Sequence, residues 1–162
     1  MFRIGFGSDT HRLEADKPLI LGGVRIESDF GAVGHSDADT LLHAVTDAIF
    51  GALALGDIGS HFSDTDEKWK NADSLVFLAE AVRLMKEKGF SVVNVDSIIN
   101  LEKPKLRPHI DKMRENLARN LEIEIDCVSV KAKTGEKVDA VGRREAIKAE
   151  AVILLGKNNR KN

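Results

Sequence analysis

Asp9 and His11 are separated by one residue, and both side chains are of types that bind divalent metals. In an extended chain, residues i and i+2 point to the same side, so one ion could contact both. Zinc accepts imidazole nitrogen and carboxylate oxygen, and a site with three protein ligands leaves a fourth position for substrate. The spacing therefore favours a metal site whose third ligand comes from elsewhere in the chain.

His35 and His43 are the nearest candidates for that third ligand. They lie eight residues apart, about 2.2 helical turns, so they cannot share one face closely, and we expect one to be a ligand and the other to serve another role. Asp39 and Asp47 lie four residues on either side of His43, so either is placed to accept a hydrogen bond from its second ring nitrogen. The alternatives are a packed histidine without a metal and a chance Asp-x-His pair.

Two basic loops lie in the second half of the chain, over 102–108 and over 131–144. Such loops can present ammonium, guanidinium, hydroxyl and backbone N–H groups to phosphates, although an exposed charged loop is the alternative for each. An acidic cleft repels a phosphate unless bound cations reverse its sign. A metal and a phosphate-bearing ligand are therefore a coherent pair of expectations.

The charge distribution supports this division. Residues 1–66 hold eleven acidic and four basic side chains, a net charge of −7, and four of the five histidines. The rest of the chain holds 15 acidic and 20 basic side chains, a net charge of +5. An acidic, histidine-rich segment is a poor surface for a nucleic-acid backbone, so we expect no nucleic-acid partner.

The length of 162 residues, with 43% hydrophobic and 31% charged residues, suits one compact domain, which we expect over residues 1–156 with a polar tail over 157–162. Apolar runs fall short of the roughly 20 residues that cross a bilayer, and the N-terminus lacks the pattern of a signal peptide. The single cysteine, Cys127, fits a reducing compartment. We expect a cytoplasmic protein without a membrane partner.

The elements that must position the chemistry follow from periodicity. Residues 2–6 alternate as a strand that leads into the loop carrying Asp9 and His11, and Gly22-Gly23 predicts a hairpin turn between two short strands at 18–26. A helix is predicted from Ser36, where Ser36 and Asp39 match a capping box, to a stop at Gly56.

The remaining chain is predicted to form a loop over 57–72, a helix over 73–88, a strand over 92–100, a helix over 109–120, a strand over 125–131, a loop over 134–142 and a helix over 144–155. This order favours an α+β fold, a mixed β-sheet with helices packed on one face.

Several motifs recur in a known order along residues 4–155: Gly7–Arg12, Leu21–Ile26, Gly34–Asp39, Leu42–Ala48, Gly56–Gly59, Phe62–Asp66, Asn94–Asp96, Pro104-Lys105, Pro108–Ile110, Val130–Ala132, Thr134 with Glu136, Gly142-Arg143 and Glu150–Val152. Together they resemble the 2-C-methyl-D-erythritol 2,4-cyclodiphosphate synthase family. The resemblance implies a metal-dependent cyclising phosphorus–oxygen lyase of the non-mevalonate isoprenoid route, in which the 2-phosphate of 4-diphosphocytidyl-2-C-methyl-D-erythritol 2-phosphate attacks the β-phosphorus and expels CMP. It also implies a homotrimer with each site between two subunits.

Carried over by position, the resemblance implies Zn²⁺ on Asp9, His11 and His43. It implies that Glu136 helps hold Mg²⁺ or Mn²⁺ bridging the substrate phosphates, and that His35 and Thr134 stabilise the transition state. The implied substrate-binding residues are Asp9, Thr10, His11, His35, Ser36, Asp57, Ile58, Gly59, Phe62, Ser63, Asp64, Thr65, Asp66, Leu101, Lys105, Leu106, Arg107, Lys133, Thr134, Glu136 and Arg143.

The chain departs from the family at the turn before Glu136, which reads Lys133-Thr134-Gly135 where the family often has a threonine-rich sequence, and at three later positions. Ala140 stands where many members place an aromatic residue, and Arg144 and Ala146 stand at usual glycines. The competing functional hypotheses are a metal-dependent phosphohydrolase, which would put solvent oxygen into its product, and a non-catalytic metal-binding module that senses isoprenoid diphosphates.

Overall fold

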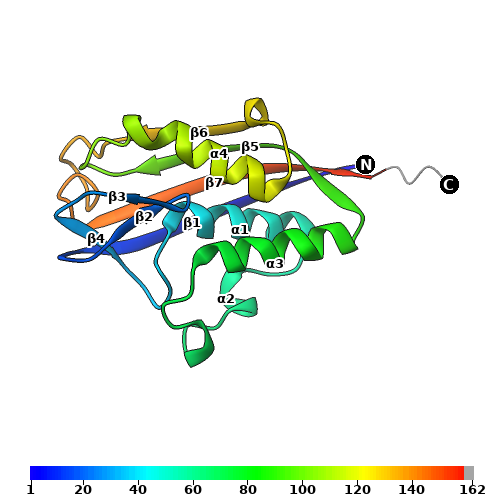
Figure 1. Cartoon of the computed structure of the whole chain (residues 1–162), viewed down its shortest axis with the longest axis horizontal. Coiled ribbons are helices and arrows are strands. Elements are labelled where there is room, and N and C mark those ends of the chain that lie inside the picture. Colours follow the sequence, from blue (N-terminus) through cyan, green and yellow to red (C-terminus); the bar gives the residue numbers. More distant parts are fainter. Residues whose placement is uncertain (159–162) are drawn as a thin grey trace.

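The computed structural model describes residues 1–158 and is built on one mixed sheet (Figure 1). Five strands lie in the order β4-β1-β7-β5-β6, and only the β5–β6 pair is parallel. A separate hairpin pairs β2 with β3. The strands are β1 (Phe2–Ala15), β2 (Leu19–Leu21), β3 (Val24–Ile26), β4 (Phe30–Val33), β5 (Phe90–Asn100), β6 (Val128–Lys133) and β7 (Ala146–Lys157).

The helices cover one face of this sheet, which confirms the predicted α+β arrangement. Figure 1 shows α1 and α3 in a layer beside β1 and β7, with α4 alongside β6. The helices are α1 (Thr40–Leu53), α2 (Ile58–His61), α3 (Ser74–Glu87) and α4 (Ile110–Leu121), with single 3₁₀ turns at η1 (Glu67–Trp69), η2 (Arg107–His109) and η3 (Ile125–Cys127). Among the residues described, no helix combines the length and apolarity needed to cross a membrane.

Two glycines on β1 let α1 lie directly on the sheet. A Cβ atom on Gly5 would come within 1.8 Å of the Ala48 carbonyl oxygen, and one on Gly7 within 2.0 Å of the Ala44 carbonyl oxygen. Distances this short exclude any side chain at either position. The close approach matters for function, because the metal-ligand candidates follow Gly7 on the same strand and precede Ala44 on the same helix.

The helix predicted over 144–155 is wrong, since this segment forms β7, the strand between β1 and β5. Its burial alternates, and the buried side chains are Ile147, Ala149, Ala151, Ile153 and Leu155. Alanine, leucine, glutamate and lysine favour helices in isolation, but hydrogen bonds to strands on both sides and a period of two outweigh that preference.

Boundaries differ elsewhere for local reasons. The first strand runs to Ala15, so Asp9 and His11 lie within β1 and not in a loop after it. β4 was not predicted. The capping box is wrong, because α1 begins at Thr40 with Asp39 as its N-cap, and the helix ends at Leu53 before a left-handed Ala54. The predicted loop over 57–72 contains α2 and η1.

The sheet face away from the helices is apolar at one end. Phe2, Ile4 and Phe6 alternate with the helix-facing glycines of β1 and are 59–72% exposed, and Val152 on β7 lies opposite Phe6. Such a contiguous exposed patch is typical of an interaction surface. Of the tail expected over 157–162, Lys157 is the last residue of β7, and 159–162 lie outside the described residues.

Candidate metal centre and substrate pockets

Asp9, His11 and His43 converge on one point. Asp9 Oδ2 lies 2.9 Å from His11 Nε2 and 2.9 Å from His43 Nδ1, and the two ring nitrogens are 3.2 Å apart. The i, i+2 spacing on β1 puts the first two side chains on the same side, as predicted, and α1 brings His43 against them. The three ligand atoms are close enough to hold one metal ion.

The ring of His11 is oriented by β4. Its Nδ1 atom lies 2.8 Å from the carbonyl oxygen of Val33, which can only accept a hydrogen bond. Nδ1 therefore carries a proton, which leaves Nε2 as the ring atom that faces Asp9 and His43 and that could bind a metal. A backbone carbonyl that holds the far nitrogen of a histidine is a common arrangement in metal sites.

The charges and hydrogen bonds of this site shift the pKa values of Asp9 and His11 in opposite directions. Burial acts to raise the pKa of Asp9, but hydrogen bonds from His11 and His43 outweigh burial and hold this pKa well below its usual value. Burial acts to lower the pKa of His11, but the hydrogen bond and negative charge of Asp9 outweigh it and raise this pKa. Converging acceptor atoms on one carboxylate and two imidazoles thus need positive charge between them, which protons or a metal ion supply.

The predicted hydrogen-bond partners of His43 are wrong. Its Nε2 atom lies 2.8 Å from Ser74 Oγ and 3.2 Å from Ser36 Oγ, not beside either aspartate. Asp47 instead accepts the backbone N–H of Ile58 at 3.0 Å and so holds the start of α2. Residues four apart lie on the same face of a helix, but the face of α1 that carries His43 is covered by the beginning of α3.

Asp39 anchors the β2–β3 hairpin to α1. Its carboxylate accepts backbone N–H groups of Gly22, Gly23 and Leu42 at 2.7–3.0 Å. Complete burial raises its pKa to about 6, against the lowering effect of these three hydrogen bonds. The carboxylate of Asp37, two residues before, contacts Ser74 at the start of α3.

A pocket of about 330 Å³ opens over the metal-ligand candidates. Its lining residues are Asp9, His11, His35, Ser36, His43, Ile58, Gly59, Phe62, Asp64, Trp69 and Phe77. His35 is outside the converging triad and its Nε2 atom lies 2.9 Å from the carbonyl oxygen of Asp66, so of the two histidines the structure places only His43 beside Asp9 and His11. Sequence reasoning missed Trp69, Phe77 and Ser74. Helical periodicity describes one helix at a time, so it cannot place residues of η1 and α3 beside His43 on α1.

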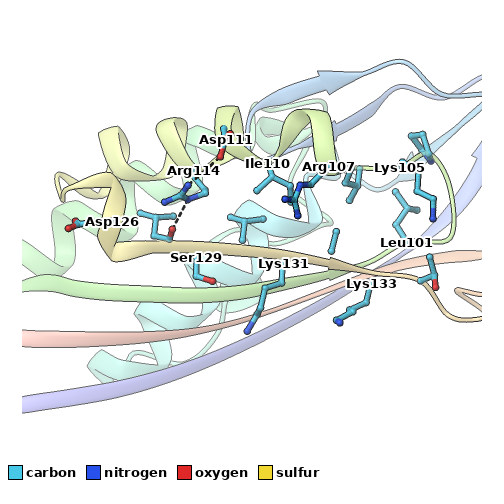
Figure 2. A pocket seen from close by; sticks show the side chains of 16 residues that line it. Leu101, Lys105, Arg107, Ile110, Asp111, Arg114, Asp126, Ser129, Lys131 and Lys133 are labelled. Atoms are coloured by element: carbon cyan, nitrogen blue, oxygen red, sulfur yellow. Dashed lines mark hydrogen bonds and ion pairs between the residues drawn. The ribbon is translucent and has the colours of Figure 1, made fainter.

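A larger pocket of about 830 Å³ lies between α4 and β6 (Figure 2). Both basic loops contribute to it, and Lys105, Arg107 and Lys133 are exposed along it. Leu101 and Leu106 give it an apolar floor, since both are at least 96% buried. Predicted substrate residues that line it are Leu101, Lys105, Leu106, Arg107, Lys133 and Thr134.

The turn after β6 places Thr134 beside Glu136. The Thr134 hydroxyl donates to Glu136 Oε1 at 2.6 Å, and the backbone N–H of Gly135 donates to Glu102 at 3.1 Å. Glu136 and Lys137 both have left-handed φ values, 50° and 61°, which L-residues rarely adopt. A strained turn that carries a carboxylate and a hydroxyl is typical of a functional loop.

Within one chain, the two pockets share no lining residue, so the chain does not bring Thr134 to the metal-ligand triad. Seven predicted substrate residues line neither pocket, and Arg143 among them forms an ion pair with exposed Glu145. The seven are Thr10, Asp57, Ser63, Thr65, Asp66, Glu136 and Arg143.

Comparisons with known proteins give one consistent result. The model of the YgbB family matches residues 2–156. A 2-C-methyl-D-erythritol 2,4-cyclodiphosphate synthase of Paraburkholderia phytofirmans is 56% identical over 157 residues, covering 97% of this chain and 99% of that protein. A solved structure of 2C-methyl-D-erythritol-2,4-cyclodiphosphate synthase is 42% identical with a TM-score of 0.89, covering 95% of this chain and 100% of its own. IspF of Plasmodium falciparum, solved as a CDP complex, is 35% identical with a TM-score of 0.86, covering 98% and 97%.

Proposed function

The chain belongs to the YgbB family, and we propose that it catalyses the reaction for which its relatives are named. It cyclises 4-diphosphocytidyl-2-C-methyl-D-erythritol 2-phosphate to 2-C-methyl-D-erythritol 2,4-cyclodiphosphate and releases CMP, in the non-mevalonate isoprenoid pathway. The observation that carries this function is the convergence of Asp9, His11 and His43 beside a pocket, in a chain that matches such synthases over nearly its full length.

The ligand set fits Zn²⁺. One carboxylate and two imidazoles, with ligand atoms 2.9–3.2 Å apart and the far nitrogen of His11 held by a carbonyl, form a three-ligand site with room for a substrate oxygen. When bound, zinc would polarise a phosphate oxygen as a Lewis acid. Glu136 would help hold Mg²⁺ or Mn²⁺, which would neutralise charge on the bridged phosphates.

The reaction breaks one bond and forms one. An oxygen of the 2-phosphate attacks the β-phosphorus, and the bond from that phosphorus to the bridging oxygen breaks, so CMP leaves with the electron pair. A phosphomonoester is already ionised near neutral pH, since its second pKa is about 6, and the attack needs no general base. The residues of the chain therefore act by positioning and by electrostatic stabilisation.

We assign His35 and Thr134 to the phosphates that carry developing charge. His35 lines the metal pocket, and Thr134 lines the second pocket. Phe62 and Trp69 would exclude water from the metal pocket, where hydrolysis would compete with ring closure.

The second pocket is suited to the cytidine end of the substrate. An apolar floor accepts a base, and the exposed cations Lys105, Arg107 and Lys133 pair with phosphate oxygens. The CDP complex of the Plasmodium falciparum relative supports a cytidine nucleotide as the ligand class.

The active unit is a homotrimer in this proposal, with each site between two subunits. Two features support it: the separation of the two pockets within one chain, and the exposed Phe2, Ile4, Phe6 and Val152 on the open sheet face. Residues 1–156 would form the whole synthase domain, which would act in the cytoplasm as a metal-dependent cyclising lyase.

The test is a product analysis in ¹⁸O-labelled water. The purified protein is incubated with the cytidylyl substrate, zinc and magnesium, and phosphorus NMR and mass spectrometry follow the products. We expect CMP and a cyclic diphosphate without ¹⁸O in equal amounts. Release of CMP with linear, ¹⁸O-labelled phosphates would identify a phosphohydrolase, and no turnover at all would favour a binding module.

A further inference from the structure

We propose that Ser74 and Asp37 are positioning residues for the metal site: they hold His43 with its Nε2 atom protonated and so direct the Nδ1 lone pair at the metal. Both residues stand outside the ligand and substrate-binding sets assigned above. The inference rests on the proposed metal site, which it deepens by adding the groups that orient one ligand.

The three side chains form a continuous hydrogen-bond chain. His43 Nε2 lies 2.8 Å from Ser74 Oγ, and Ser74 is fully buried while His43 is 8% exposed. The same hydroxyl contacts Asp37 Oδ1, and the other oxygen of Asp37 accepts the backbone N–H of Ser74 at 3.2 Å. The chain thus joins α1, the loop before it and the first residue of α3.

The direction of the hydrogen bonds among His43, Ser74 and Asp37 follows from which atoms can donate and which can only accept. An ionised carboxylate only accepts, so the single hydroxyl proton of Ser74 is donated to Asp37. The lone pairs of Ser74 then face His43, and the contact at 2.8 Å is a hydrogen bond only if His43 Nε2 is the donor. A neutral ring protonated at Nε2 has its lone pair on Nδ1, the atom 2.9 Å from Asp9.

Ser36 offers the only competing arrangement among the described partners of Nε2. Its hydroxyl lies at 3.2 Å and could donate to an unprotonated Nε2. The lone pairs of Nε2 and Ser74 would then face each other at 2.8 Å in a buried site, which is unfavourable. In that tautomer Nδ1 would carry the proton and could not bind a metal.

The backbone around the chain is fixed independently of the serine hydroxyl. Asn71 N–H donates to the His35 carbonyl at 2.7 Å, and Asp37 N–H donates to the Ala72 carbonyl at 3.0 Å. These bonds hold the start of α3 against the loop before α1. Removing the hydroxyl should therefore change the orientation and tautomer of His43 more than the fold.

The experiment compares zinc affinity by competition with a chromophoric chelator. Ser74→Ala should weaken affinity about 10- to 100-fold, as loss of an outer partner of a metal-bound histidine does. The matched control is Ser97→Ala, which removes an equally buried hydroxyl that donates to the Ser129 carbonyl at 2.8 Å, and its affinity should stay within twofold. Asp37→Asn should also weaken zinc binding. The new side-chain amide would face both the hydroxyl and the backbone N–H of Ser74, so its NH₂ group would lie against one of these two donors.

A second readout is the nitrogen-15 spectrum of His43 in the metal-free protein. His43 Nε2 should carry a proton in the wild type, whether or not Nδ1 also carries one that it donates to Asp9, and the population protonated at Nε2 should fall in Ser74→Ala. Unchanged zinc affinity in both variants, or wild-type His43 protonated only at Nδ1, would overturn the proposal. If the wild type binds no zinc, the metal site itself is wrong, while the spectrum still decides the hydrogen-bond chain. If Ser74→Ala fails to fold, the wild-type spectrum and Asp37→Asn decide it.

Discussion

The metal pocket, over Asp9, His11 and His43, and the second pocket between α4 and β6, here called the cation-lined pocket, are built in opposite ways. In the metal pocket, His11 is fixed by the Val33 carbonyl and His43 by Ser74, and the reactive atoms lie within 3.2 Å of one another before any ligand arrives. In the second pocket, Lys105, Arg107 and Lys133 are exposed side chains on loops and on an edge strand.

The difference indicates how each pocket binds. A preorganised site loses little conformational entropy when its ligand binds, whereas long exposed side chains must be ordered at binding. The three metal-ligand candidates therefore come together within one chain, whereas we expect the exposed cations of the second pocket to become ordered only when a ligand binds. The strained turn that follows β6, next to the second pocket, carries the candidate groups Thr134 and Glu136.

The largest expected effect tests whether the metal pocket depends on each ligand. His43→Ala removes one of three converging ligand atoms, and two ligands should not retain the ion, so zinc should fall from one per chain to none measurable by metal analysis. His109→Ala, a half-buried histidine far along the chain, serves as the control and should keep its zinc. One zinc per chain in His43→Ala would contradict the ligand assignment.

The contrast between the pockets explains what the sequence predicted. The i, i+2 rule alone put Asp9 and His11 on one side of an extended strand, and the resemblance added His43, which helical spacing had left open against His35. The partner of His43 was missed because Ser74 lies 31 residues further along the chain, and short-range spacing contains no information on which helix end covers a given face.

The fold shows the same limit. Periodicity gave no sign that a helix packs against Gly5 and Gly7, yet these two glycines decide how closely α1 approaches β1. The sequence predicts a helix where β7 lies because its residues favour helices individually, although its apolar residues repeat with a period of two. Local patterns thus identified most elements, while long-range contacts decided β7, β4 and the partners of the buried polar groups.

The second prediction separates the two pockets functionally. Thr134→Val removes a hydroxyl from the strained turn and leaves the metal pocket untouched, because the pockets share no lining residue. Turnover should fall about 100-fold, the scale of losing one preorganised donor to developing charge. Zinc content should remain one per chain. A variant that also lost its zinc would contradict the separation of the pockets.

The third prediction measures the looser binding of the cation-lined pocket. Lys105→Ala should raise KM about tenfold with little change in kcat, because an exposed cation on a loop contributes to binding the substrate in both ground and transition states. Its effect should shrink as salt screens the charge. The control is Lys112→Ala on the exposed side of α4, where the lysine pairs with Glu115. Equal effects of the two substitutions would argue against a specific role for Lys105.

The smallest expected effect concerns a contact between β4 and the loop that follows Glu136. Arg144, in the loop after Glu136, lies with its guanidinium carbon 4.8 Å from the ring centre of Phe30, on the strand that also holds His11 through Val33. Arg144 has a φ of 64°, which explains why glycine suits this position. Arg144→Gly removes both the backbone strain and the cation–π contact, so the two effects oppose each other in the free energy of unfolding.

A double-mutant cycle isolates the contact from the strain. Phe30→Leu removes the aromatic face without altering the backbone at Arg144, and the strain cancels between the two Arg144→Gly measurements. Chemical denaturation of the four proteins should give a coupling free energy of about 0.5–1 kcal/mol. A coupling near zero would mean that the cation–π contact adds nothing to the other contacts that hold the Thr134–Glu145 loop, such as the hydrogen bond from Leu13 N–H to the Glu145 carbonyl at 2.9 Å.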